Sequence, residues 1–523
     1  NAPVTLLGDV LMSGDNISIN GDVNDDGIGS PAGDLQFNAT GDVTTDNIGD
    51  TTPIDTLTIV DANSVTIDGN VTLDNDFEQE TVTTATTING NLDIADQAVI
   101  EEGDVVVNGD LDADTARVGV SLSGDTDGAD ASLAVNTGAV TIGNGNGNLD
   151  IGFRETASLS GTPQTVGSLD LSNASGVTVD VSNVRIGIIN GNLSGEGTAR
   201  GDLIFSDAGT NALTADSVIA GDSSHRGNGV VSTIQFGGAA NTMDVDSLTL
   251  GGQKSQATIT IDAGGTLTLS GNNGAAVDAD LGFNVTGNTG TQSVGTLDMT
   301  GGTLNATFGT LRLGRHNVGG GSGTGTFTFG NGLVTASSLE LANGGGNPAG
   351  TINQNGGELI VSGPITSEGG TADYNLADGT LRFETLQNNG GTFTFDWTGG
   401  TIANVAGQDL TNVDVDVDMT GAGPWTAEIQ AGQTGEFQSN ADLTGMGDLT
   451  KIGGGTLTLA GTNIYAGATN VDAGTLALSN ATNNNIANST PITVAAGTIL
   501  DVTALAGGRL DLAAGQTLQG EGD

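Results

Sequence analysis

Residues 86–111 read TTINGNLDIADQAVIEEGDVVVNGDL, and this stretch contains the same short element twice. The element is Ile or Val, then Asn or Asp, Gly, Asn or Asp, and finally Leu or Val; it spans 88–92 and returns at 107–111. Its polar centre is rich in turn formers, and the flanking residues alternate between apolar and polar, as half-buried strands do. A strand-and-turn unit of this length predicts one coil of a β-solenoid.

The element recurs along the chain and starts at Ile19, Ile67, Ile88, Val107 and Ile189. With a period of about 20–24 residues, successive starts lie two, one, one and four coils apart. A second element, Gly-Thr followed by Leu or Ile, has similar spacing at Gly455, Gly474 and Gly497. No stretch longer than about ten residues has helical periodicity. We therefore predict an all-β fold, a parallel β-solenoid with coils of about 20–24 residues, wound as a right-handed β-helix and almost without helix.

Stacking explains how such short strands become stable. One coil cannot bury its inward Val, Ile and Leu side chains, whereas coils stacked about 4.8 Å apart bury a continuous apolar column and pair every strand. Asn-Gly and Asp-Gly at the corners adopt left-handed backbone conformations easily. An array of β-sandwiches is the alternative fold, but sandwiches usually need buried Trp or Tyr anchors, and the chain has only 2 Trp and 2 Tyr.

The composition excludes several classes of protein. The 523 residues include 62 Asp and Glu against 11 Lys and Arg, which gives a net charge of -51. A polyanion repels nucleic acid, and no apolar run approaches the roughly 18 residues that cross a membrane as a helix. The absence of cysteine excludes disulfides and thiolate-bound metals. The chain starts at Asn1 without a methionine or an apolar leader, from which we expect a processed, exported protein.

Residues 445–478 read GMGDLTKIGGGTLTLAGTNIYAGATNVDAGTLAL. This segment resembles the autotransporter-associated β-strand repeat of passenger domains in secreted bacterial surface proteins, through Leu449, Thr450, Lys451, 455–459, Asn463, Tyr465, Gly467 and 473–476. The rest of the chain resembles the same proteins only loosely. The resemblance implies a parallel β-helix on or outside a bacterial cell, without an enzymatic activity attached to the repeat.

Charge and repeat type together predict three regions. Residues 1–150 hold 24 Asp and 4 Glu against one basic residue, Arg117, and form a highly acidic solenoid region that binds calcium in our hypothesis. Residues 151–440 form a solenoid stack with glycine-rich loops, and residues 441–523 form the region of the autotransporter-associated repeat. The first region carries more than half of the negative charge, so we expect cations to neutralise it.

A calcium loop is the first candidate site. Residues 22–27 read DVNDDG, with the alternating oxygen ligands and the sharp-turn glycine of the first half of a calcium-binding loop. The second half departs from the EF-hand pattern, because the twelfth position is Gly33 and the nearest carboxylate is Asp34. We predict Ca²⁺ ligands at Asp22, Asn24, Asp26 and Asp34, with a solvated polar turn as the alternative.

A second acidic turn is the other candidate cation site. Asp125, Asp127 and Asp130 flank Gly128, which favours a turn with several carboxylates. Solubility of the surface is the alternative explanation for these residues.

An enzyme is the least favoured class. A β-helix polysaccharide lyase or hydrolase needs paired carboxylates, or calcium with a Lys or Arg, in a groove. The basic cluster of the chain is Arg312, Arg315 and His316, in the segment LRLGRHNVGGGSGTG. We interpret this cluster as surface ion pairs or corner contacts, and we expect no catalysis.

Two non-catalytic functions remain. The first is a structural protein that self-assembles, end to end or laterally, into an extracellular filament, matrix or surface layer. The second is a passenger-type adhesin that binds a polysaccharide or a host surface. Both imply a location outside the cell or on the bacterial surface. The apolar start of the chain is a candidate strand for pairing with a neighbouring subunit, through Asn1, Val4, Leu6, Leu7 and Val10.

Overall fold

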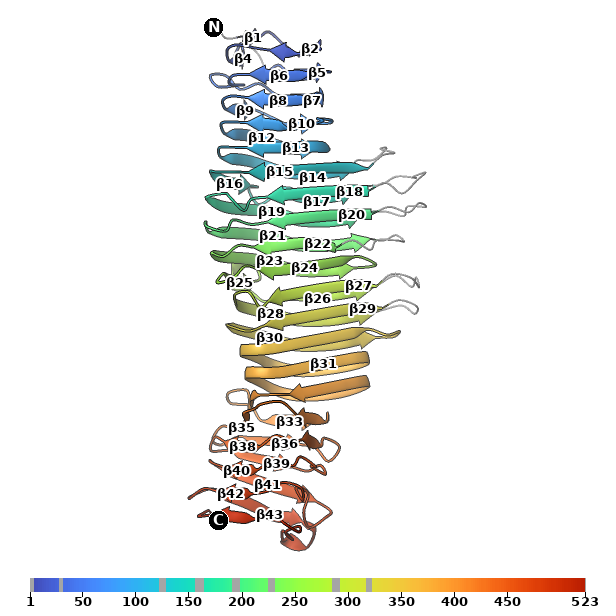
Figure 1. Ribbon diagram of the computed structural model, residues 1–523, viewed down its shortest axis with the longest axis vertical. Helices are drawn as coiled ribbons and strands as arrows, with labels where there is room; N and C mark the ends of the chain where they lie inside the picture. Colours follow the sequence, from blue (N-terminus) through green and yellow to red (C-terminus); the bar gives the residue numbers. More distant parts are fainter. Residues whose placement is uncertain are drawn as a thin grey trace. The chain divides into compact units, whose positions relative to one another are not determined.

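The computed structural model describes residues 4–27, 32–121, 128–155, 164–190, 198–223, 231–284, 292–316 and 322–522, and these are the residues meant below. The chain forms two compact units: unit 1 contains Asn1–Ala275 and Asn288–Thr296, and unit 2 contains Ala276–Gly287 and Leu297–Asp523. Each unit is a parallel β-solenoid, in which a strand pairs with strands of the coils before and after it (Figure 1). The all-β solenoid prediction is confirmed, and the handedness of the winding stays a prediction.

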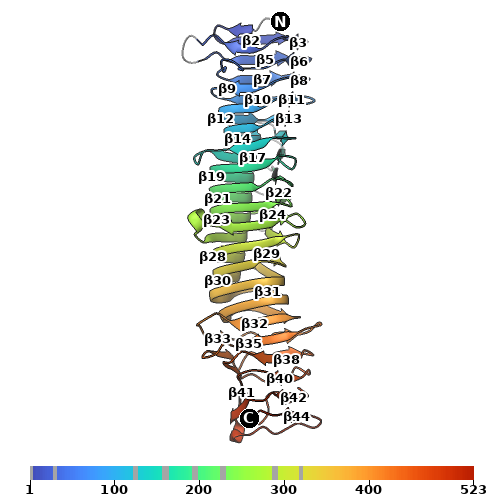
Figure 2. The ribbon, with the colours of Figure 1, turned by 90° about the vertical axis from the view of Figure 1, so that its left-hand side faces the viewer.

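The described strands of unit 1 stack on three faces (Figure 2). Face A contains β2 (Val10–Gly14), β5 (Leu35–Ala39), β7 (Leu57–Asp61), β10 (Phe77–Gln79) and β17 (Asn148–Arg154). Face B contains β3 (Ile17–Ser18), β6 (Asp42–Thr45), β8 (Ser64–Ile67), β11 (Thr86–Ile88), β13 (Glu102–Val107), β15 (Ala129–Val135), β18 (Gln164–Asp170), β20 (Thr198–Ile204), β22 (Val231–Phe236) and β24 (Gln256–Ile261).

Face C contains β1 (Val4–Leu6), β4 (Val23–Asp25), β9 (Val71–Leu73), β16 (Ala139–Ile142) and β25 (Thr266–Ser270). Long strands continue from face C onto face A: β12 (Leu92–Ile100), β14 (Leu111–Ser121), β19 (Gly176–Ile189), β21 (Asn211–Ser223) and β23 (Ala240–Gly252). A single 3-10 turn, η1 (Asn272–Gly274), follows β25. Strand β27 (Ser293–Met299) begins among residues of unit 1 and ends among residues of unit 2.

Unit 2 begins with long strands, which are β26 (Val277–Asn284), β28 (Thr303–His316), β29 (Gly323–Phe329), β30 (Leu333–Gly344) and β31 (Ala349–Trp397). Shorter strands follow: β32 (Gly400–Asn404), β33 (Leu410–Val413), β34 (Val417–Met419), β35 (Trp425–Glu428), β36 (Thr434–Phe437), β37 (Leu443–Gly445), β38 (Leu449–Ile452), β39 (Thr456–Leu459), β40 (Thr469–Val471), β41 (Thr475–Asn480), β42 (Ile492–Val494), β43 (Ile499–Leu505), η2 (Ala506–Gly508) and β44 (Leu518–Gly520). The long strand β31 winds through successive coils by turning at glycines with positive φ, such as Gly357 and Gly379.

The core of the first coils follows the sequence period. Ile67 of β8, Ile88 of β11 and Val107 of β13 pair in register, and all three are fully buried. Alternation along each strand places these side chains inside, where an apolar side chain contributes about 1.5–3 kcal/mol. The prediction that these three elements mark successive coils is therefore confirmed.

The predicted period is wrong for Ile189. Ile189 pairs with Arg154 and Ser223 on face A, whereas Val107 lies on face B. The reason is a change of coil length. In the first coils, residues that pair between neighbouring coils are close in sequence: Thr86 pairs with Val105, and Val10 with Leu35. In later coils they are further apart, as in the pair of Leu149 and Val184. We call the coils of residues 4–110 narrow and those of residues 111–261 wide.

A column of glycines pinches each wide coil at one level, which we call the waist. Its face-A residues have φ between 62° and 65° and occupy equivalent positions in successive coils: Gly119, Gly152, Gly187, Gly221 and Gly251. Opposite them, face B carries small residues, among them Gly167, Gly201 and Ser232. A Cβ on Gly152 would lie 1.8 Å from the carbonyl oxygen of Arg200, so the two backbones touch. The main core lies on one side of the waist, and a second interior lies on the other side. We call this second interior the lateral interior and its residues those beyond the waist.

Unit 2 has the same feature in its long-strand coils. Gly282 and Gly314 are equivalent in register and have φ of 71° and 69°, and Ala342 continues their column with φ 50°. Opposite this column, Gly325 pairs with Gly350. The residues beyond the waist in unit 2 include Asn284 and His316, both of which are fully buried.

Candidate functional site

The residues of the predicted calcium loop serve as anchors for the next coil. Asp22 Oδ1 accepts hydrogen bonds from the backbone N–H of Asn47 at 3.3 Å and from its Nδ2 at 2.8 Å. Asn24 is buried in β4, and its Oδ1 accepts from the backbone N–H groups of Thr51 and Thr52 at 2.9 and 3.4 Å. Both side chains therefore satisfy backbone donors that the corner would otherwise leave unpaired.

Asp25, which was not among the predicted ligands, accepts hydrogen bonds from the backbone of two glycines. Its carboxylate accepts from the backbone N–H of Gly33 and of Gly27, each at 2.9 Å, and these two hydrogen bonds lower its pKa. Asp34 follows Gly33, and its backbone N–H donates to Asp9 Oδ1 at 3.4 Å. Burial and the negative charges of Asp9 and Asp55 raise the pKa of Asp34, because each of these effects disfavours the charged carboxylate.

The predicted ligands that lie in the described ranges do not form a cluster of three carboxylates. Within the described ranges, no three His, Cys, Asp or Glu side chains are close enough together to hold a metal ion. Asp125 and Asp127 lie outside the described residues. Asp130 is exposed on β15, where it pairs in register with Glu102 and Val166. Calcium binding at either turn stays a prediction.

The predicted assembly segment is partly built into the chain's own sheet. Strand β1 pairs with β4, with Val4 opposite Val23 and Leu6 opposite Asp25. Leu6 is buried, whereas Leu7 is 84% exposed. Val10 begins β2 and pairs with Leu35, and Asn1 lies outside the described residues. A role of this segment in assembly stays a prediction.

Acidic and amide side chains form ladders at the corners of the narrow coils, and one of these ladders continues into the first wide coil. In one ladder, Asn47 Oδ1 accepts from the backbone N–H of Asn70, Asn70 Oδ1 from that of Asn91, and Asn91 Oδ1 from that of Asp110, at 2.8–2.9 Å. A second ladder joins side chain to side chain, from Asn136 through Asn108 and Asn89 to Asp68. Part of the unusual Asp and Asn content thus has a structural use inside the solenoid.

A charge ladder crosses three wide coils on face A of unit 1. Asp150 is buried between two arginines that pair with it in register: Arg117 Nε lies 3.1 Å from its Oδ2, and Arg185 Nε lies 2.6 Å from its Oδ1. A second Arg185 nitrogen donates to Oδ2 at 2.7 Å, so this contact is bidentate. The Arg185 guanidinium also covers the Phe153 ring at 4.2 Å. Sequence spacing gave no sign of this ladder, because each of its members lies in a different coil.

The basic cluster that an enzyme would use is engaged in ion pairs. Arg312 lies 3.8 Å from Asp280 and 3.5 Å from Glu340, and Arg315 lies 3.7 Å from Asp280. Burial raises the pKa of Asp280, and the two arginines partly oppose this shift. The ion-pair interpretation of the arginines is confirmed. A surface ion pair is wrong for His316: its side chain is fully buried and faces the interior two residues after the waist glycine Gly314, and its Nδ1 lies 2.8 Å from the Gly345 carbonyl oxygen.

The coil of residues 449–478 is held together by buried polar groups. Lys451 has no exposed surface, and its ammonium donates to the carbonyl oxygens of Ile452, Gly453 and Ala473 at 2.7, 2.8 and 3.1 Å. Three acceptors match the three N–H donors of an ammonium group. Burial lowers the pKa of Lys451 to about 8, and the nearby Glu428 opposes that shift.

Asn463 and Tyr465 anchor the loop between β39 and β40. Asn463 Oδ1 accepts from the backbone N–H of Leu443 at 3.0 Å, and its Nδ2 donates to the Gly461 carbonyl at 3.2 Å. The buried Tyr465 hydroxyl lies 2.5 Å from Thr469 Oγ1, which in turn lies 2.7 Å from Ser489 Oγ. Burial raises the pKa of Tyr465 to about 12, so the phenol stays protonated and serves as a structural contact.

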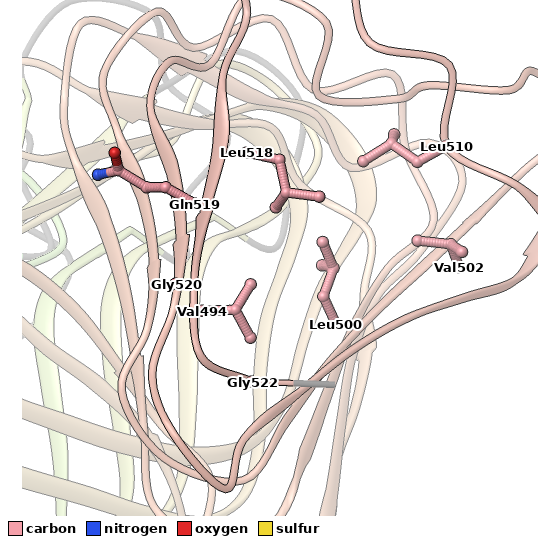
Figure 3. A pocket seen from close by; sticks show the side chains of 8 residues that line it. All are labelled: Val494, Leu500, Val502, Leu510, Leu518, Gln519, Gly520 and Gly522. Carbon is pink, nitrogen blue, oxygen red and sulfur yellow. The ribbon is translucent and has the colours of Figure 1, made fainter.

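A cavity of about 320 Å³ lies beside β42, β43 and β44 in unit 2 (Figure 3). Its lining is mostly apolar, with the side chains of Val494, Leu500, Val502, Leu510 and Leu518 around it and Gln519 at its side. Leu518 is 50% exposed. This cavity contains no ionisable side chain among its lining residues, so it offers apolar contact and not acid–base chemistry.

Comparison with known families identifies the coil described above. Residues 449–478 match the passenger-associated-transport-repeat family, over strands β38 to β41. This match confirms the resemblance to an autotransporter passenger repeat, and such a repeat indicates a surface-associated passenger. No curated protein and no solved structure matches the chain. Among the described residues, no helix has the length and apolar character needed to cross a membrane.

Proposed function

We propose that this chain is an exported, passenger-type β-solenoid that acts outside the cell or on the bacterial surface as a structural scaffold, without catalysis. The observation that carries the proposal is the passenger repeat at residues 449–478, which is built into a solenoid coil by Lys451, Asn463 and Tyr465. These buried contacts give the repeat a role in holding coils together.

The use of charged groups elsewhere supports a structural role. The ladder of Arg117, Asp150 and Arg185 joins successive coils, and Arg382 does the same by pairing with Glu358 at 2.7 Å and Glu428 at 3.0 Å. These are the residue types that acid–base chemistry would need, and here they engage one another. Incubation with uronate polymers is the direct test, and release of product would contradict a non-catalytic scaffold.

We further propose that the scaffold self-assembles by stacking coils. Support comes from the apolar cavity beside β44 and from the exposed Ile499 and Leu518, since a coil of a second copy would bury these side chains. Calcium belongs to this proposal as a counterion for the acidic residues 1–150, where stacked carboxylates such as Asp93 and Asp112 repel each other.

Negative-stain electron microscopy of the purified chain tests the assembly. We expect filaments or sheets with millimolar calcium that loosen after chelation. Leu518→Glu should abolish them, and Leu333→Glu, at a residue 43% exposed in another coil, should not. Single particles under every condition would contradict self-assembly and leave the adhesin as the better proposal.

A polar cavity in unit 1 favours the adhesin as the second candidate. It has a volume of about 240 Å³, and its lining consists of Glu78, Gln79, Glu80, Gln97, Val99, Glu101 and Arg117. Carboxylates, amides and a guanidinium are groups that hydrogen-bond sugar hydroxyls. Binding on a glycan array that Gln97→Ala removes would support a carbohydrate-binding adhesin.

A further inference from the structure

His316 occupies an interior position beyond the waist of unit 2. It is the last residue of β28, two residues after Gly314, and its exposed fraction is 0%. Its Nδ1 lies 2.8 Å from the carbonyl oxygen of Gly345. A carbonyl only accepts, so Nδ1 carries the hydrogen and the ring nitrogen Nε2 holds a lone pair. In the described part of the chain, Nε2 has no hydrogen-bond partner.

The backbone beside His316 is closely packed. His316 pairs in register with Asn284 on one side and Gly344 on the other. Gly323, at the start of β29, packs so closely that a Cβ there would lie 2.1 Å from the Gly282 oxygen and 2.5 Å from the Arg315 oxygen. A second proton on the ring would create a buried N–H donor and a positive charge at Nε2, which has no hydrogen-bond partner in the described part of the chain.

The charged groups of the neighbouring strands do not offset this cost. They are Asp278 and Asp280 on β26, Arg312 and Arg315 on β28, and Glu340 on β30, while β29 contains no titratable residue. The long strand β31, which pairs with β29 and β30, carries the charged residues Glu358, Glu368, Asp373, Asp378, Arg382, Glu384 and Asp396 over its successive coils. Asp280, Glu340 and the two arginines are partly exposed and pair with one another, and Arg315 lies over the Phe283 ring at 4.6 Å. Burial is the cause that lowers the pKa of His316.

We propose that His316 is an acid-sensitive lock on the long-strand coils of unit 2. At neutral pH the uncharged ring keeps the end of β28 and the start of β29 closed over the lateral interior. On acidification the ring takes up its second proton, and this part of the coil opens so that the imidazolium reaches water. The lock does not depend on whether the chain is a scaffold or an adhesin.

Proton linkage gives the direction in which pH shifts the equilibrium between the closed and the open state. The closed state holds a histidine with a lowered pKa, and the open state holds one near 6.5, so the open state binds more protons. Stability of the closed state is therefore fully present above about pH 6.5 and is lost as the pH falls below it. Each unit of pKa difference between the two states changes the opening equilibrium about tenfold.

Hydrogen exchange measured by mass spectrometry on the full chain tests the lock. After correction for intrinsic exchange rates, we expect protection of peptides from β28 and β29 to fall between pH 7.5 and pH 5.0, by about tenfold for each unit by which the pKa of His316 differs between the closed and open states. Peptides from β17 and β19 of unit 1 serve as the internal reference and should change less. His316→Gln should remove the pH dependence, whereas His225→Gln, at the other histidine of the chain, should leave it intact.

A second measurement keeps the proposal testable if His316→Gln does not fold. With two histidines in the chain, NMR of the histidine-labelled protein can follow both rings, and His225→Gln assigns the signals. We expect one ring to titrate clearly below pH 6.5. Titration of His316 at an ordinary pKa, or unchanged protection of β28 and β29 at pH 5.0, would overturn the lock.

Discussion

The narrow and the wide coils of unit 1 solve the same packing problem in different ways. In the narrow coils, residues such as Ile67, Ile88 and Val107 fill one interior, and Asn and Asp side chains close the corners. In the wide coils, the strands on face A extend beyond the main core. There the backbones of faces A and B, the two walls of the coil, come into contact at Gly152 and Gly201. Widening a coil thus creates a second interior, and only glycine allows the walls to approach this closely.

The second interior also has a different chemistry. Beyond the waist of unit 1, Arg154 is fully buried and donates to Thr165 at 3.2 Å, while Ile189 packs against Ala199. On the outer side, Asp150 holds two arginines. Among the described residues of the narrow coils, by contrast, no charged side chain is fully buried. The stability of the wide coils therefore depends more on individual contacts than that of the narrow coils. Substitutions in the wide coils should accordingly have the larger effects.

The largest effect is expected at the waist. Gly152→Ala places a Cβ 1.8 Å from the Arg200 oxygen at a φ of 63°, so the walls must separate. Left-handed strain and overpacking together should destabilise the wide coils by about 3 kcal/mol or more. Gly264→Ala is the matched control: its φ is 84°, but no atom lies within 4 Å of the new Cβ, and about 1 kcal/mol is expected. Urea unfolding compares the two, and equal losses would show that the waist is not tightly packed.

A smaller loss is expected from the charge ladder. Asp150→Asn leaves Arg117 and Arg185 without their shared carboxylate in a place where Asp150 is 1% exposed. Breaking such a buried pair costs about 3 kcal/mol. Asp511→Asn removes an ion pair to Arg509 whose side chains are 52% and 68% exposed, and this should cost less than about 1 kcal/mol. Thermal unfolding of both variants gives the comparison; a similar shift in Tm would place the ladder among ordinary surface pairs.

Asp222 distinguishes wide from narrow coils through pH. Burial next to the waist glycine Gly221 raises its pKa to about 6, partly opposed by a hydrogen bond from Gln253. The folded chain then binds the proton more tightly than the unfolded chain, so this contribution is present below about pH 4 and is lost as the pH rises through 6. Asp222→Asn should therefore stabilise the protein at pH 7.5 and change little at pH 4. Denaturation at both pH values checks this, and equal effects at the two would contradict it.

The smallest effect is expected in a narrow-coil ladder. Asn70→Ala removes the oxygen that accepts from the Asn91 backbone N–H at 2.9 Å. The corner is exposed, so water can replace part of this bond, and about 1 kcal/mol should be lost. Asn70→Asp keeps the acceptor and is the control. Hydrogen exchange of the Asn91 amide reports on the ladder directly; unchanged protection in Asn70→Ala would show that the ladder does not hold this corner.

The sequence predicted the narrow coils well and the wide coils poorly. The spacing of Ile67, Ile88 and Val107 is regular because each narrow coil has one interior and short corners. The same spacing failed at Ile189, since the wide coils add residues whose number varies from coil to coil. A signal for the waist was nevertheless present, as an aliphatic residue followed by glycine at 118–119, 151–152 and 186–187.

Site prediction was limited for a related reason. The acidic motif at residues 22–27 has the residue types of a cation loop, but the structure uses Asp22 and Asn24 to accept backbone N–H groups from the next coil. The alternation of Asp and Asn in the sequence does not show which backbone N–H groups of the next coil will lie beside these oxygens. The repeat around Lys451 was recognised from its sequence, whereas the three carbonyls that surround its ammonium became visible only in the coil.

The sequence by itself determined the parallel β-solenoid, its period in the narrow coils, the acidic surface and the passenger repeat, because these follow from local alternation, turn chemistry and composition. Tertiary structure alone decided the width of the coils, the waist, the burial of His316 and the pairing of Asp150 with two arginines. These features join residues of different coils, far apart in the chain, and their energies arise from contacts between those coils. Such contacts depend on register, which no single strand specifies.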